Sequence, residues 1–117
     1  MTQKCQYNYK PLFNSLDGPD NVTISPFDEY VTLMEGSQFG PITCSAECNP
    51  ECEILWRFNG STSQSFEDIN TNRTLFFDSV SRTKSGTYRC VARNPIDKSK
   101  FLRKNVYLNV LCKYLVH

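Results

Sequence analysis

The stretch ITCSAECNPECEILWRF at residues 42–58 decides the fold of this chain, together with SGTYRCVARN at residues 85–94. Successive side chains of a β-strand point to opposite faces of the sheet, so apolar residues at every second position mark a strand with one buried face. The first stretch shows this pattern on both sides of a turn, at Ile42, Cys44 and Ala46 and again at Ile54, Trp56 and Phe58. It predicts two strands, over residues 42–46 and 53–58.

The same alternation predicts further strands along the rest of the chain. They are an edge strand over 22–24 that Pro26 breaks and 30–33 resumes, and strands over 74–78, 87–93 and 101–111. Turn signals follow several of these runs, at Glu35-Gly36-Ser37, Asn59-Gly60 and Asn94-Pro95. No segment has a helical period, and residues 61–72 are polar and poorly patterned. The sequence therefore predicts an all-β fold.

Four residues of these strands, Cys44, Trp56, Tyr88 and Cys90, resemble the characteristic residues of an immunoglobulin domain in their order and spacing. The resemblance implies a Cys44–Cys90 disulfide across a sandwich, with Trp56 packed on it. It also implies that the Tyr88 hydroxyl bonds back to the backbone. We therefore expect an immunoglobulin-like β-sandwich of two antiparallel sheets with Greek-key connections. Because residues 61–72 leave little room for the two extra strands of a variable-type domain, we expect the constant-2 or intermediate type.

The length of 117 residues suits one such domain, which needs about 100 residues. We assign residues 18–112 to the domain, 1–17 to a leader or linker segment and 113–117 to a C-terminal tail. The first residues lack the apolar core of a signal peptide, so we interpret the chain as a mature piece or an excised domain. No apolar run reaches the roughly 20 residues that cross a bilayer, so we expect no membrane insertion by this chain.

Four further cysteines remain, and two of them flank the first turn. Counting in twos from Cys44 and from Trp56 puts Cys48 and Cys52 on the inward faces of their strands. Inward residues at the mouth of a tight turn can meet the geometry that a disulfide needs, so Cys48–Cys52 is the second predicted bridge. By elimination Cys5 and Cys112 form the third, although six cysteines allow many other connectivities.

A metal site is the alternative for Cys44, Cys48 and Cys52. Their spacing of four residues would align three thiolates on one face of a helix. Against this, Pro50 interrupts the stretch, no fourth ligand lies nearby in the sequence, and the flanking residues alternate as strands. We therefore expect structural disulfides, no metal and no cofactor.

Cysteine content and glycosylation signals both indicate an extracellular protein, either secreted or at the cell surface. Disulfides persist in oxidising compartments, and six cysteines are many for so short a chain. Three N-x-S/T sequons point the same way and predict a glycoprotein modified at Asn21, Asn59 and Asn72.

The sequence lacks the motifs of catalysis. Its only histidine is His117 at the terminus, and it has no G-x-S-x-G, no glycine-rich phosphate loop and no H-E-x-x-H. Its carboxylates are typical of a solvated surface, among them Glu51, Glu53, Glu67 and Asp68. We expect a binding module and not an enzyme. A net charge of +1 gives no general attraction to nucleic acid.

The outward face of the strands 53–58, 87–93 and 101–111 is the predicted binding face. These strands are neighbours in an immunoglobulin fold, so their outward residues form one surface. The residues expected to project into solvent are Leu55, Arg57, Arg89, Val91, Arg93, Arg103 and Tyr107. Interfaces are enriched in arginine and aromatic residues, although long charged side chains on a strand also serve solubility alone. We expect Asn21 and Asn72 on the opposite sheet, whereas Asn59 would border this face or partly block it.

The runs GPDNVTISP at 18–26 and NVYLNVL at 105–111 resemble the domain boundaries of carcinoembryonic-antigen-related and similar cell-adhesion or immune-receptor proteins. The resemblance implies recognition of another protein, either the same protein in a homophilic contact or a different one. An alternative is a secreted immune recognition protein that binds microbial or other anionic glycans through the same arginines. A third is a spacer domain without a partner. One departure is Lys84, which stands where such domains usually carry an aspartate that forms a salt bridge.

Overall fold

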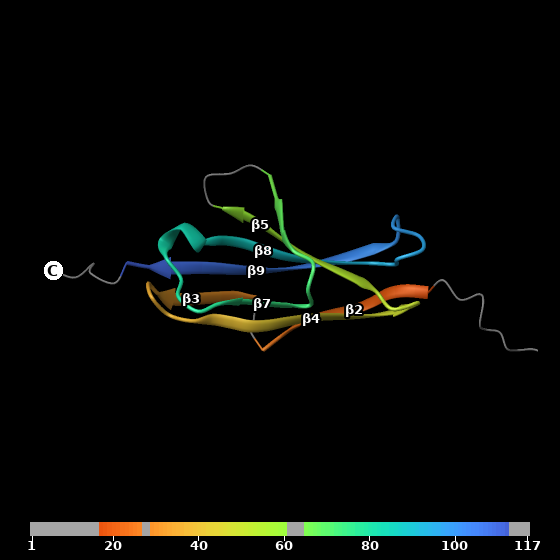
Figure 1. The fold of residues 1–117 in the computed structure, drawn as a ribbon, viewed down its shortest axis with the longest axis horizontal. Coiled ribbons are helices and arrows are strands. Elements are labelled where there is room, and N and C mark those ends of the chain that lie inside the picture. Colours follow the sequence, from red (N-terminus) through yellow and green to blue (C-terminus); the bar gives the residue numbers. More distant parts are fainter. Residues whose placement is uncertain (1–16, 27–28, 61–64, 113–117) are drawn as a thin grey trace, which may run out of the picture.

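The computed structural model describes residues 17–26, 29–60 and 65–112, in which strands form two sheets packed as the two layers of Figure 1. One sheet has the order β2-β4-β7, with bounds Asp17–Ser25, Phe39–Asn49 and Thr74–Phe77. The other has the order β3-β9-β8-β5-β6, with bounds Tyr30–Met34, Phe101–Leu111, Gly86–Arg93, Glu53–Gly60 and Glu67–Asn70. A short 3-10 helix, η1 (Arg82–Lys84), precedes β8.

The core lies between the two sheets, where the alternating apolar residues of both meet. Ile42 and Cys44 on β4, Trp56 on β5 and Cys90 on β8 are fully buried there. The indole N–H of Trp56 donates a hydrogen bond to the carbonyl oxygen of Arg73 (3.2 Å), so the polar atom of this large side chain is satisfied. Two sheets packed on one apolar core confirm the predicted all-β sandwich.

Two of the predicted disulfides are present. Cys44 on β4 is bonded to Cys90 on β8 across the two sheets, with 6.4 Å between their Cα atoms. Cys48 and Cys52 are bonded across the turn between β4 and β5, with 5.1 Å between their Cα atoms. Because the metal ligand would be a thiolate and these sulfurs are oxidised, the metal alternative is wrong. The third predicted pair involves Cys5, which lies outside the described residues.

Tyr88 closes the corner that leads into β8. Its hydroxyl donates a hydrogen bond to the carbonyl oxygen of Lys84 (2.7 Å), which is the backbone contact that the resemblance implies. Burial raises the pKa of Tyr88 well above its usual value, because the phenolate would be poorly solvated here. The Lys84 ammonium lies 4.8 Å from the ring centroid of Phe77, a cation–π contact at the position where similar domains carry an aspartate.

We expect Tyr88→Phe to lower the free energy of unfolding by about 1 kcal/mol at neutral pH, because the partly buried Lys84 carbonyl loses its donor. The difference should shrink at alkaline pH. In the wild type the phenol ionises at a lower pH in the unfolded chain than in the folded one, so stability falls as the pH rises above the usual tyrosine pKa. The variant lacks this loss. Urea unfolding at about pH 7 and about pH 11 measures both values, and a pH-independent difference would contradict the expectation.

β3 departs from the expected pairing. The sequence predicts residues 30–33 as the second half of an antiparallel edge strand, but β3 belongs to the other sheet and runs parallel to β9, with Tyr30 opposite Tyr107. Pro26 has no N–H to donate, so the ladder between β2 and β4 ends at Ser25 and the chain crosses to the second sheet. The crossing brings Tyr30 beside the strands of the predicted binding face.

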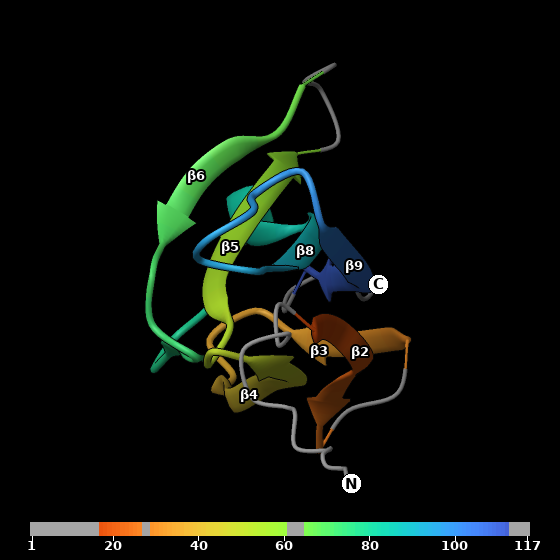
Figure 2. The same ribbon diagram turned by 90° about the vertical axis from the view of Figure 1, so that its right-hand side faces the viewer.

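One edge strand forms within the poorly patterned stretch 61–72. β6 runs antiparallel to β5, with Asp68 opposite Arg57, and stands at the outer edge of the sheet in Figure 2. In the described part of this stretch there is one strand and not the two extra strands of a variable-type domain. The residues of β6, EDIN, carry little intrinsic strand preference, so its pairing with β5 decides its conformation.

Candidate binding face

The five-stranded sheet has one face turned away from the core, which we call the outer face. Alternation places on it the residues of β5, β8 and β9 that lie between core positions. Arg89 on β8 is central, with Arg57 opposite it on β5 and Asn105 opposite it on β9. All the residues of the predicted binding face lie here, namely Leu55, Arg57, Arg89, Val91, Arg93, Arg103 and Tyr107.

Leu55 and Val91 lie on the outer face but do not project into solvent, so this part of the prediction is wrong. Their exposed fractions are only 6% and 7%. They are opposite each other on β5 and β8, two inner strands of the sheet, and charged side chains flank them along both strands. The aliphatic stems of such side chains cover apolar neighbours while the charged ends stay in water. Alternation predicts the face on which a side chain lies, but not how much water reaches it.

Two of the four arginines of the outer face have carboxylate partners. Arg57 Nε lies 2.9 Å from a carboxylate oxygen of Asp68 on β6. Arg93 lies 3.7 Å from Glu53, and the same carboxylate lies 3.3 Å from the ammonium of Lys98. Partly exposed pairs of this kind add little stability, but they cancel charge. At the end of the outer face near Glu53, one carboxylate is therefore shared by two cations and offsets part of their charge.

Arg89 is held by contacts on two sides. The carbon at the centre of its guanidinium lies 3.9 Å from the ring centroid of Phe66, a cation–π geometry. Its Nε donates a hydrogen bond to Asn105 Oδ1 (2.9 Å), and Asn105 Nδ2 donates in turn to the Tyr107 hydroxyl (3.1 Å). Burial lowers the pKa of Arg89, and so does the positive charge of Arg103.

A hollow of about 450 Å³ opens beside Arg89. Three cations, one carboxylate and two neutral polar residues line it, namely Arg89, Arg103, Lys104, Glu29, Asn105 and Tyr107. Within the described ranges, the ion pairs of this protein involve neither Arg89 nor Arg103. This hollow therefore carries a larger excess of positive charge than the end near Glu53, where one carboxylate is shared by two cations.

Two tyrosines continue this surface to the edge of the sheet. The ring of Tyr30 on β3 stacks on that of Tyr107, with centroids 5.1 Å apart, and Tyr30 is 73% exposed. Sequence analysis misses both Tyr30 and Phe66. The inward phase of Val31 and Leu33 does mark Tyr30 as outward, but the sheet to which its strand belongs is decided by pairing with β9.

The three sequons divide between the two sheets. Asn21 on β2 and Asn72 next to β7 are exposed and belong to the three-stranded side of the sandwich. Asn59 is half-buried and has the phase of Arg57 on β5, so it lies on the outer face. Glycosylation itself stays a prediction, and a glycan on Asn59 would cover the end of β5 beyond Arg57.

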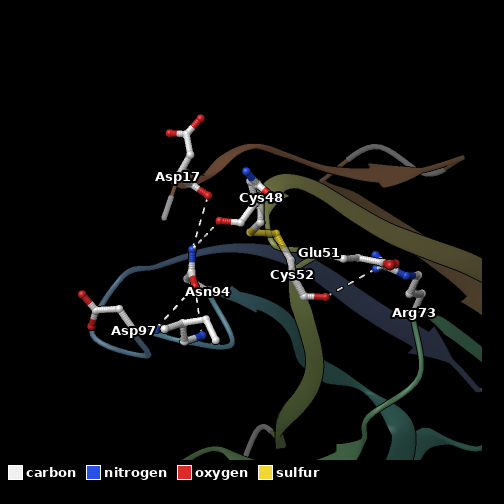
Figure 3. Close-up of a disulfide and its surroundings, with 9 residues drawn as sticks. Asp17, Cys48, Glu51, Cys52, Arg73, Asn94 and Asp97 are labelled. Carbon is white, nitrogen blue, oxygen red and sulfur yellow. Dashed lines mark hydrogen bonds and ion pairs between the residues drawn. A yellow bond between two sulfur atoms is a disulfide. The ribbon is translucent and has the colours of Figure 1, made fainter. Parts of the chain in front are cut away.

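A second organised region is the loop end, formed by the start of β2, the β4–β5 turn and the β8–β9 turn (Figure 3). The fully buried Asn94 joins all three. Its Nδ2 donates to the carbonyl oxygens of Asp17 (3.3 Å) and Asn49 (3.4 Å). Its Oδ1 accepts from the backbone N–H groups of Ile96 (3.0 Å) and Asp97 (3.4 Å). Sequence analysis identifies Asn94 only as a turn residue, because asparagine in a turn signal is normally solvated.

Arg73 and the Cys48–Cys52 disulfide stabilise the same loop end from the other side. The Arg73 guanidinium pairs with the carboxylate of Glu51 and donates to the carbonyl oxygen of Cys52 (3.4 Å), as Figure 3 shows. The β4–β5 turn is thus tied to β8–β9 through Asn94 and to the segment before β7 through Arg73. The loop end is a fixed structure and not a set of independent loops.

Comparison with known proteins agrees with this architecture. The family model described as an immunoglobulin domain matches residues 19–94. Immunoglobulin superfamily member 10 of Mus musculus is 30% identical over 92 residues, and peroxidasin of Drosophila melanogaster is 33% identical over 89 residues. Each match covers 74% of this chain but only 3% and 6% of those proteins. The chain therefore spans a small part of the length of these relatives.

Solved structures with a similar fold also contain immunoglobulin domains. The structure of Dpr2 Ig1-Ig2 in complex with DIP-Theta Ig1-Ig3 matches with a TM-score of 0.58 and 25% identity, covering 76% of this chain and 32% of that chain. The N-terminal four Ig domains of Dscam1 isoform 6.9 match with a TM-score of 0.60 and 17% identity, covering 81% of this chain and 26% of that chain. At that identity the Dscam1 match shows the fold alone.

The disulfides and the fold indicate an extracellular domain, since disulfides persist in oxidising compartments. Over the ranges that the structure describes, no helix has the length and apolar character to cross a membrane. The two-sheet core, the Cys44–Cys90 bond with Trp56, and the family match over residues 19–94 together identify the chain. It belongs to the immunoglobulin superfamily.

Proposed function

We propose that this domain binds another protein through its outer face, as a cell-adhesion or immune-receptor module. The observation that carries the proposal is the contrast between the two outward surfaces of the sandwich. The outer face combines arginines, stacked tyrosines and a covered apolar pair, and two of the arginines and one of the tyrosines line one hollow. Arginine and aromatic residues are the types enriched in protein interfaces.

The opposite surface is mostly polar, apart from the exposed Phe76 on β7, and several of its polar groups bond to one another. The hydroxyls of Thr23 and Ser45 lie 3.2 Å apart, as do those of Thr43 and Thr74. Asn21 Nδ2 donates to the carboxylate of Glu47 (3.0 Å). Two sequons lie on this side, and a surface that carries glycans is poorly suited to close protein contact. The outer face is the better candidate for recognition.

The structural relative at 25% identity supports a protein partner, because that structure is itself a complex between two proteins with immunoglobulin domains. The identity of the partner does not transfer from it, since this chain covers only 32% of that chain.

Binding of anionic glycans is the second candidate. The observation that favours it is the hollow in which Tyr107 lies beside Arg89 and Arg103. The ring of Tyr107 stacks on that of the exposed Tyr30. Sugar rings stack on such aromatic faces, and acidic groups would pair with the guanidinium groups.

A glycan placed on the outer face tests the proposal without changing an arginine. Tyr30→Asn completes an N-x-T sequon with Thr32 on β3, and Thr43→Asn completes an N-x-S sequon with Ser45 on the opposite surface. Glycosylation of both variants would be checked by mass. The wild type and the variants would then be made as multimers and tested for binding to a panel of extracellular proteins, which includes this chain itself. We expect Tyr30→Asn to abolish binding to a captured partner and Thr43→Asn to leave it unchanged. Binding that survives the Tyr30 glycan would refute the role of the outer face.

A further inference from the structure

We infer that the partner of the outer face is a protein different from this chain, and that it inserts acidic side chains into the hollow between Arg89 and Arg103. The inference rests on the proposed function of the outer face. It adds to that function the chemistry of the partner and the exclusion of a face-to-face homophilic contact.

The first support is the distribution of charge over the outer face. Arg57 and Arg93 have the carboxylate partners Asp68 and Glu53, and Glu53 is shared with Lys98. The hollow at Arg89 holds three cations and one carboxylate, so an incoming group meets net positive charge there. A complementary partner places negative charge opposite such a site, and this arrangement determines specificity and speeds association.

The second support is the placement of Arg89. Phe66 stacks on its guanidinium and Asn105 accepts a hydrogen bond from its Nε, so the side chain is oriented before a partner arrives. Burial and the neighbouring positive charge of Arg103 both lower the pKa of Arg89, and within the described ranges no carboxylate pairs with its guanidinium to give compensation. A carboxylate would supply that compensation, and carboxylates match the planar guanidinium in bidentate geometry.

The same charges argue against a homophilic pair. Two copies related by a twofold axis would oppose the same surface patch of each molecule. If the axis passes through the hollow, that contact sets Arg89 and Arg103 of one copy against those of the other, while Asp68 and Glu53 are already paired within each copy. Like charges placed together across an interface are costly, so this face selects a different, acidic protein.

A peptide titration tests the acidic partner directly. The ¹⁵N-labelled domain would be titrated with a peptide of alternating glutamate and glycine, with its glutamine version as the neutral control, and amide shifts would be followed. We expect shifts centred on Arg89, Arg103 and Asn105 for the glutamate peptide alone, and loss of these shifts in high salt, because exposed charges are screened.

Two charge reversals locate the binding site of the peptide. Arg103→Glu should weaken binding of the glutamate peptide by about tenfold or more, since it removes one pairing group and adds repulsion. Arg82→Glu makes the same charge change on η1, away from the outer face, and should leave the affinity within about twofold. Equal weakening by both variants would show a non-specific charge effect and overturn the inference. Shifts produced by a sulfated heparin oligosaccharide and not by the glutamate peptide would overturn it in favour of a glycan.

Sedimentation of the wild type tests the homophilic exclusion. We expect a monomer at all concentrations, and a dimer that the Tyr30→Asn glycan dissociates would overturn the inference. Failure of the inference and failure of the proposed function remain distinguishable. If the Tyr30→Asn glycan abolishes capture of a partner but Arg103→Glu does not, the outer face binds protein without using this charge. If neither change affects capture, the proposed function fails as well.

Discussion

Replacing Cys44 and Cys90 together by alanine is expected to lower the free energy of unfolding by about 4 kcal/mol, the larger of two very different disulfide effects in this domain. The bond closes a loop with a sequence separation of 46, so it strongly restricts the unfolded chain. The total free energy of unfolding of such domains is roughly 5–15 kcal/mol. The loss is therefore a large fraction of the total, and at the lower end of this range the double variant is close to unfolded.

The matched control is the double alanine variant at Cys48 and Cys52. Its loop has a sequence separation of only 4, and the same chain-entropy argument gives a loss of about 2 kcal/mol. Urea unfolding followed by the fluorescence of Trp56, the single tryptophan, measures both variants. Equal losses in the two variants would contradict the chain-entropy explanation, because loop length would then not decide the effect.

Asn94→Ala is expected to lower the free energy of unfolding by about 3 kcal/mol, although the residue lies in a turn between two strands. Asn94 is fully buried and bonds to the backbone of three separate segments. Alanine would leave two carbonyl oxygens and two N–H groups without these partners, and a buried polar group without a partner is costly. Hydrogen exchange of the Ile96 and Asp97 amides should also accelerate, since both lose their acceptor.

Asn94→Asp separates the donor half of this network from the acceptor half. The carboxylate still accepts from Ile96 and Asp97, but it cannot donate to the Asp17 and Asn49 carbonyl oxygens. Burial should raise its pKa in the folded state, so the unfolded chain releases the proton at lower pH. The aspartate variant should therefore lose stability as the pH rises from about 4 to about 7, whereas the deficit of Asn94→Ala should stay constant. Parallel pH profiles of the two variants, measured by urea unfolding, would contradict this assignment.

We expect the Cys44–Cys90 bond and the loop end to support the proposed binding by keeping the domain rigid. The Cys44–Cys90 bond joins the two sheets, and the loop end ties the β8–β9 turn to the rest of the domain. A surface that is ordered before binding loses less conformational freedom when its partner arrives. We therefore expect the outer face to bind with little change in its backbone.

The strands and the Cys48–Cys52 bond were predictable from local pattern, whereas the sandwich and the Cys44–Cys90 bond were implied by the resemblance to immunoglobulin domains. A period of two in residues 42–58 assigns the inward side of two strands, and it puts Cys48 and Cys52 at the mouth of a tight turn, where they can form a bridge. The phase of β8 and β9 likewise places the arginines on one face. The strands, their phases and the short bridge depend on neighbours in the sequence, which is why a local pattern predicts them.

The rest depended on contacts between residues far apart in the chain. The sequence by itself determined the strands, the inward side of each and the candidate arginines, because alternation and residue type are local properties. Only the tertiary structure decided that Tyr30 stacks on Tyr107, that Phe66 covers Arg89, that Leu55 and Val91 are buried, and that Asn94 holds three segments. Strand pairing decides which side chains become neighbours and which charges find a partner, and no local pattern contains that information.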